Sequence, residues 1–186
     1  MLTWRDASGY GRLLRGGLIA AVVVGVALLG WSWRHPEAFH DSGGWGVTAP
    51  NSKIGETLYV GMSYPRSEDG GYVTLHGGHV NFNSGADNAD VELLLCTIDP
   101  NAGVGAIGSY RGDSIHEDCS NLVPIHGQRL HLESAGMSQQ VVLAVTLTYR
   151  GSVDISDITL DYTYGWHRGS QRTGGQVVMS TEEIDT

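Results

Sequence analysis

The sequence predicts a mainly β protein, in which a single N-terminal transmembrane helix is followed by an immunoglobulin-like β-sandwich of about seven strands. Three observations support this fold class. An uncharged, apolar run fills residues 16–33. Several later segments alternate apolar and polar residues with the period of two that is typical of strands. Clusters of Gly, Pro, Asn and Asp, the residues of turns, separate these segments.

The first expected element is the transmembrane helix over residues 16–33, which lies between Arg15 and Arg34. A helix over this run is roughly 27 Å long at about 1.5 Å per residue, close to the hydrocarbon thickness of a bilayer. No polar face interrupts the run, which disfavours the alternative of a helix buried in a soluble core. A cleaved secretory peptide is the other alternative, although Trp31 and Trp33 stand where a cleavage site requires small residues.

Charge asymmetry predicts the orientation of this helix. Residues 1–15 contain three arginines and one acid, whereas residues 35–186 contain 19 of the 20 acids in the chain. The positive flank of a membrane helix stays in the cytoplasm. We therefore expect a single-pass protein of the cell membrane, with a cytoplasmic N-terminal segment at 1–15 and an extracytoplasmic C-terminal domain. The acidic composition also disfavours nucleic-acid binding, which needs a basic surface.

Composition divides the extracytoplasmic part into three regions. Residues 34–55 are rich in Gly and Pro and are expected to form a flexible linker. Residues 56–180 are the β-sandwich domain, long enough to bury one core. Residues 181–186 form an acidic tail that we expect to fray.

Strand periodicity within the domain is clearest where Val141, Leu143, Val145 and Leu147 share one face. The alternation slips by one residue at Gly77-Gly78, which predicts a β-bulge or a kink there. It slips again at Ser156-Asp157, which predicts a β-bulge or a strand that crosses between the sheets. No Trp lies between the two cysteines, so an up-and-down or jelly-roll arrangement remains an alternative to the immunoglobulin-like one. The seven expected strands lie near 57–64, 72–82, 90–98, 129–134, 140–149, 153–164 and 174–180.

Cys96 and Cys119 are the only cysteines, and both follow the expected membrane helix. An even number of cysteines in an extracytoplasmic domain favours a disulfide bond. On the loop-entropy model such a bond stabilises the fold by about 3 kcal/mol. The alternative is two unpaired cysteines that act as small apolar residues.

The candidate partner-binding residues are Trp166, His167, Arg168 and Arg172, in a segment expected to form a loop between the last two strands. Trp and Arg are enriched at binding hot spots because they bury a large area while keeping a polar group. We expect this loop to contact an envelope protein or an anionic envelope polymer. In the alternative interpretation Trp166 closes one end of the sandwich, and the two arginines pair with surface acids.

The leading prediction is a non-enzymatic protein that binds or supports another cell-envelope component. No Gly-x-Ser-x-Gly motif is present, and paired cysteines cannot supply a thiolate nucleophile, so no catalytic residue and no cofactor are expected. The alternative function is an extracytoplasmic domain that binds a metal or small ligand through His76 and His79. Two histidines are too few for a protein metal site, so no metal is expected.

Overall fold

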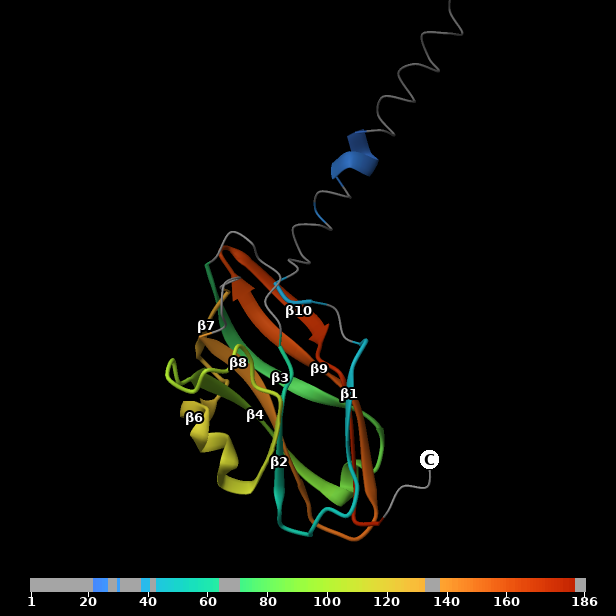
Figure 1. Cartoon of the computed structure of the whole chain (residues 1–186). Helices are drawn as coiled ribbons and strands as arrows, with labels where there is room; N and C mark the ends of the chain where they lie inside the picture. The colour runs from blue at the N-terminus through green and yellow to red at the C-terminus, as the bar shows by residue number, and fades with distance from the viewer. Residues whose placement is uncertain are drawn as a thin grey trace, which may run out of the picture.

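The computed structural model describes residues 22–26, 30, 38–40, 43–63, 71–132 and 138–182. In these ranges the protein is mainly β, and its strands form two sheets arranged as a sandwich (Figure 1). Residues 22–26 and Gly30 are helical, and the rest of the expected span 16–33 lies outside the described residues. Among the residues that are described, no helix is long and apolar enough to cross a membrane.

The larger sheet has six strands in the order β1-β11-β9-β3-β7, with β10 paired to β9 beside this row. Strands β1 and β11 are parallel, and the other pairs are antiparallel. The bounds are β1 Gly46–Ala49, β3 Tyr72–Ser84, β7 Arg129–His131, β9 Ser152–Tyr164, β10 His167–Thr173 and β11 Gln176–Ser180.

The smaller sheet has five antiparallel strands in the order β5-β2-β8-β4-β6. Two 3₁₀ helices complete the described fold: η1 connects β3 to β4, and η2 lies between β5 and β6. The bounds are β2 Thr57–Gly61, β4 Ala89–Ile98, β5 Ser109–Arg111, β6 Cys119–Pro124, β8 Gln139–Leu147, η1 Ala86–Asn88 and η2 Gly112–Glu117.

The expected two-sheet sandwich is confirmed, but its strands are more numerous than expected. All seven expected segments form strands, namely β2, β3, β4, β7, β8, β9 and β11. Strands β1, β5, β6 and β10 bring the number in the described part of the chain to eleven, so the expected count of about seven was too low. These four have few buried apolar side chains, and so they show no apolar alternation in the sequence.

Both expected β-bulges are present in the pairing of β3 with β9. The register shifts between Leu75 and Gly77, and Ser156 is skipped where Asp157 pairs with Asn81 and Ile155 with Phe82. A bulge adds one residue to one strand, so side chains beyond it change face. Without the second bulge, Asp157 would share the core-facing side of β9 with Ile155. Because Ser156 is the extra residue, Ile158 takes the core-facing side and Asp157 changes face.

The main core lies between the two sheets, and a second apolar cluster lies on the outer face of the smaller sheet. Strand β8 supplies both, because Leu143 and Val145 face the main core while Val142 faces the second cluster. The expected disulfide joins Cys96 of β4 to Cys119 of β6, with the two Cα atoms 5.5 Å apart. It closes the segment that carries η2 over the second cluster.

The region expected to be a flexible linker, 34–55, contains ordered structure where it is described. Ala38 and Phe39 are buried, and the Phe39 ring packs edge-on against Tyr162 with centroids 5.3 Å apart. Gln171 fixes this segment: its Oε1 accepts hydrogen bonds from the Ala38 and Phe39 amides at 3.0 and 3.1 Å, and its Nε2 donates to the Phe39 carbonyl. Strand β1 follows, so the sandwich begins about ten residues earlier than expected.

Candidate functional site

The segment expected to be a partner-binding loop is mostly strand. Residues 167–173 form β10, which pairs with β9 over its whole length, and only Gly165 and Trp166 form the turn. Gly165 has a φ of 60°, as the first position of a two-residue type II′ hairpin turn requires. The four candidate residues therefore lie at different places on a hairpin rather than together on one loop.

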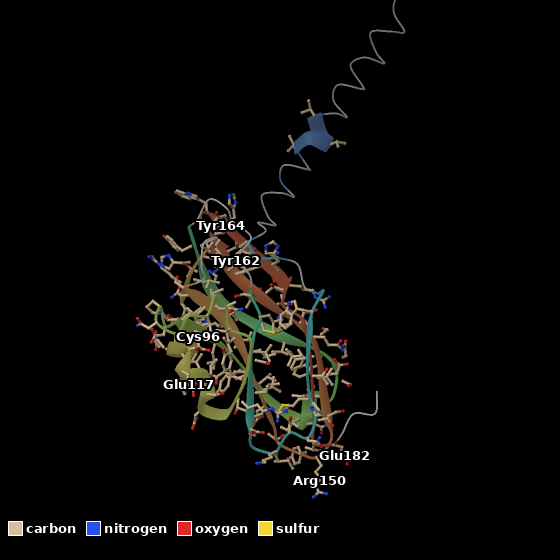
Figure 2. The ribbon with its side chains drawn as sticks, viewed as in Figure 1. Cys96, Glu117, Arg150, Tyr162, Tyr164 and Glu182 are labelled. Carbon is tan, nitrogen blue, oxygen red and sulfur yellow. A yellow bond between two sulfur atoms is a disulfide. The ribbon has the colours of Figure 1, made fainter. Side chains whose placement is uncertain are left out.

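Trp166 projects from the tip of this hairpin and is 96% exposed. The alternative interpretation, in which this ring closes one end of the sandwich, is therefore wrong. His167 follows the turn, is half-buried and pairs with Tyr164 across it. Figure 2 shows Tyr164 at one end of the sandwich, with Arg150 and Glu182 at the opposite end.

Arg172 is exposed to solvent, but its guanidinium forms an ion pair with the buried Asp157. Its Nε donates to the Asp157 carboxylate at 3.0 Å, and Asn81 donates to the same oxygen. Burial alone would raise the pKa of Asp157, but the hydrogen bonds from Arg172 and Asn81 outweigh it and lower that pKa. The same hydrogen bond raises the pKa of Arg172. Arg172 thus stabilises the sheet, while Arg168 is exposed and has no ion-pair partner among the described residues.

The two candidate metal ligands, His76 and His79, lie on β3, and His79 also lines the groove between β3 and β4. His76 Nε2 is hydrogen-bonded to Thr163 Oγ1 at 2.6 Å, and His79 is exposed. No group of three His, Cys, Asp or Glu side chains is placed to hold a metal ion within the described ranges. The described residues therefore add no third ligand to the two histidines that the sequence indicated.

A groove that the sequence did not indicate runs between β3 and β4, where the two sheets separate. It has a volume of about 540 Å³. Its apolar lining comes from half-buried side chains of both sheets, which also border the main core. These side chains are Val80, Phe82, Val91 and Leu93, with Ile125 at one end.

Two strand edges without partners border this groove. On the side away from β9, β3 pairs with β7 only at 72–74, and in the described chain no strand continues that pairing. On the side away from β8, β4 pairs with β6 only from Leu94 onward. The segment after β6 closes one end, where the Ile125 amide donates to the Leu93 carbonyl.

Such an edge exposes a row of amides and carbonyls that can pair with another extended chain. Natural proteins often protect long edges with lysines, prolines or inward-pointing charges. Between Gly77 and Ser84, β3 carries none of these, although its bulges interrupt the regular spacing. The groove thus combines backbone hydrogen-bonding groups with an apolar floor, which together suit a peptide in β conformation.

Two further polar contacts involve residues of the segment between the two cysteines. Tyr110 donates a short hydrogen bond to Asp118, and this bond, burial and the nearby acids raise the pKa of Tyr110 to about 12. Arg111 pairs with Glu56 at 3.5 Å. These contacts fix the segment between the two cysteines and offer no arrangement of acid, base and nucleophile.

The chain was compared with protein-family models and with curated proteins, and neither comparison finds a match.

Proposed function

We propose that this protein is a non-enzymatic, single-pass membrane protein whose extracytoplasmic, immunoglobulin-like domain binds an extended segment of another cell-envelope protein in the β3–β4 groove. The anchoring and the orientation rest on the uncharged run at 16–33 and on the arginines that precede it. The binding mode rests on one observation, the apolar groove flanked by two unpaired strand edges.

The strand order supports an immunoglobulin-like topology. In such a sandwich the second, fifth and fourth strands are neighbours in one sheet, and the seventh, sixth and third in the other. The rows β2-β8-β4 and β11-β9-β3 follow this order when β5, β6 and β7 are treated as an insertion and β10 as an extension of the last hairpin. Because a fold does not determine a function, the groove and not the topology carries the proposal.

A polypeptide fits the groove better than the other expected partner, an anionic polymer. The floor is apolar and the rim residues include Glu92, which would repel a polyanion. The free edge of β3 from Gly77 to Ser84 is roughly 25 Å long, enough to pair with a strand of about eight residues. Alternate side chains of that strand would enter the groove beside Phe82 and Val91.

Photocrosslinking from the groove in intact cells tests this function. A photoreactive residue replaces His79, at the exposed edge of β3, and a matched one replaces Tyr149, which is 65% exposed in the turn after β8. We expect the groove position to capture one short segment of an envelope protein and the control position not to capture it. Captured segments that are unrelated to one another, or equal capture at both positions, would contradict the proposal.

A synthetic peptide of the captured segment then tests the binding mode with the purified full-length protein. We expect the peptide to slow hydrogen exchange at the β3 edge amides, because strand addition gives them hydrogen-bond partners. Val91→Lys, which places a charge on the apolar floor, should abolish peptide binding, and Tyr149→Lys should leave it unchanged. Binding that survives Val91→Lys and leaves the β3 amides unprotected would rule out the groove.

A further inference from the structure

Trp166 at the tip of the β9–β10 hairpin is the most exposed large apolar side chain in the described chain. The ring does not stand alone at this end of the sandwich. Tyr72 at the start of β3 is 46% exposed, and the next residue of β3, Val73, pairs with Tyr164 at the end of β9. Trp166 and Tyr72 are therefore two exposed aromatic side chains near Tyr164, whose end of the sandwich is marked in Figure 2.

The described segments that meet at this aromatic end carry basic but no acidic residues. Residues 71–75, 126–132 and 162–170 contain no Asp or Glu. They contain Arg168, which is exposed, and Arg129, whose guanidinium lies 4.6 Å from the centre of the Tyr72 ring. Exposed Trp and Tyr beside Arg is the composition of surfaces that lie at a membrane–water interface.

The path of the chain brings this end close to the expected membrane span. Residues 38–40 and 43–46 run beside β10 and β11. The Ala38 amide donates to Gln171, the His40 carbonyl accepts from Thr173, and Gly46 pairs in parallel with Gln176. Followed backwards from Gly46 to Ala38, the chain therefore travels along β10 toward its first residue. The turn with Trp166 therefore lies on the side from which the N-terminal part of the chain enters the sandwich.

The distances are compatible with contact. Trp33, the last residue of the expected span, precedes Ala38 by five positions. Five residues of extended chain reach at most about 17 Å. Gln171, which binds Ala38, is five residues from Trp166 along the hairpin, which is again about 17 Å. A bilayer that holds residues 16–33 is thus within reach of the hairpin tip.

We propose that the β9–β10 tip is a second membrane contact, with Trp166 and Tyr72 in the headgroup region of the bilayer that holds the N-terminal span. The proposal rests on the anchoring proposed above and adds the orientation of the domain. Two contacts, the span and the tip, fix which end of the sandwich faces the membrane. The β3–β4 groove, on the side of the sandwich, then stays open to a partner.

Fluorescence quenching by brominated lipids tests the contact in the full-length protein. The protein is reconstituted into liposomes of phosphatidylcholine with a minority of phosphatidylglycerol, with Trp4, Trp31 and Trp33 replaced by Phe to remove signal from the span. Trp45 and Trp166 remain. We expect brominated acyl chains to quench this parent, and Trp166→Phe to lose most of the quenching.

Tyr149 provides the matched control, because it adjoins Arg150 at the opposite end of the sandwich and is 65% exposed. Tyr149→Trp in the Trp166→Phe background should not be quenched. Equal quenching of the parent and Trp166→Phe, in protein that floats with the liposomes, would overturn the tip contact and leave the anchor intact. Protein that does not float overturns the anchor as well. Shielding of Trp166 only when an envelope protein is added would identify a protein contact and overturn the membrane contact.

Discussion

Arg172 and Arg168 show how far two residues of the same type can differ in role. Four positions apart on β10, both are exposed to solvent to some degree, but only Arg172 has a buried partner. Asp157 is 3% exposed, and its carboxylate accepts hydrogen bonds from both Arg172 and Asn81. Removal of either donor leaves a buried charge with fewer hydrogen bonds, and such a loss is costly.

We therefore predict that Arg172→Ala destabilises the domain and Arg168→Ala does not. The loss for Arg172→Ala should be smaller than for a fully buried pair, because the Arg172 side chain is 60% exposed and solvent screens its charge, but it should exceed the loss for Arg168→Ala. Arg168→Ala is the control and should change the free energy of unfolding by less than about 0.5 kcal/mol. Urea unfolding of both variants at neutral pH measures the difference, and equal losses would contradict the assignment.

The pH dependence of this difference follows from the lowered pKa of Asp157. A carboxyl group with a lower pKa in the folded state stabilises the fold above its unfolded pKa of about 3.9, and loses that contribution as pH falls through the folded pKa. The gap between the wild type and Arg172→Ala should therefore be constant near neutral pH and shrink in acid. A gap that widens below pH 4 would show that Asp157 is not the partner that matters.

The sequence could not reveal this pair, although it revealed the bulge that creates it. The slip in apolar alternation at Ser156 was predictable, because Val153, Ile155, Ile158 and Leu160 all face the core and cannot share one uninterrupted period. Which basic residue meets Asp157 depends on the strand that lies beside β9. That strand, β10, has no apolar alternation from which it could be predicted.

At the scale of elements, the sequence predicted the strands that bury side chains and missed those that mainly pair backbones. Strand β8 is buried on both faces, and its apolar residues identify it unambiguously. Strand β10 alternates exposed polar residues with half-buried ones, and β1 lies in a segment rich in Gly. Their stability comes from hydrogen bonds to β9 and β11, which leave no hydrophobic pattern.

The groove could not be predicted for a related reason. Val80, Phe82, Val91 and Leu93 have the sequence pattern of ordinary core residues, and they do border the core. They line an open groove only because β7 stops pairing with β3 at Thr74 and β6 stops pairing with β4 at Leu94. The length of a neighbouring strand is a property of the tertiary structure, so no local pattern reports it.

The disulfide gives a prediction at the scale of the element that it closes. It joins residues separated by 23 positions, and the chain between them carries η2 and the apolar residues Ile107 and Ile115 of the second cluster. The double variant Cys96→Ala, Cys119→Ala should lose about 3 kcal/mol of stability, as expected for a loop of this length. Because the second cluster lies outside the main core, we expect local unfolding of the double variant to begin at this cluster.

Hydrogen exchange measures where the loss occurs. In the double variant, exchange should rise most for the segment 99–118 and least for β9 and β3. Tyr110→Phe, which removes the hydrogen bond to Asp118 in the same segment but keeps the disulfide, is a matched comparison with a smaller expected effect. A uniform increase across both sheets would show instead that the disulfide supports the whole sandwich.

At the scale of the whole molecule, two different surfaces have the two proposed functions. In the proposed arrangement the aromatic end faces the bilayer, and the groove on the side is left for a partner. This division depends on the compartment of the domain. A disulfide persists in an oxidising compartment and is rare in the cytoplasm, so the state of the two cysteines reports the side of the membrane.

The last prediction tests that compartment directly. In intact cells, trapped with a thiol-alkylating reagent before lysis, Cys96 and Cys119 should resist modification until a reductant is added. An epitope placed after Thr186 should be removed by protease added outside the cytoplasmic membrane, while a cytoplasmic control protein stays intact. Alkylation of both cysteines without reductant, together with a protected epitope, would place the domain in the cytoplasm. The groove would then have to find its partner there, and the hairpin tip would face the opposite leaflet.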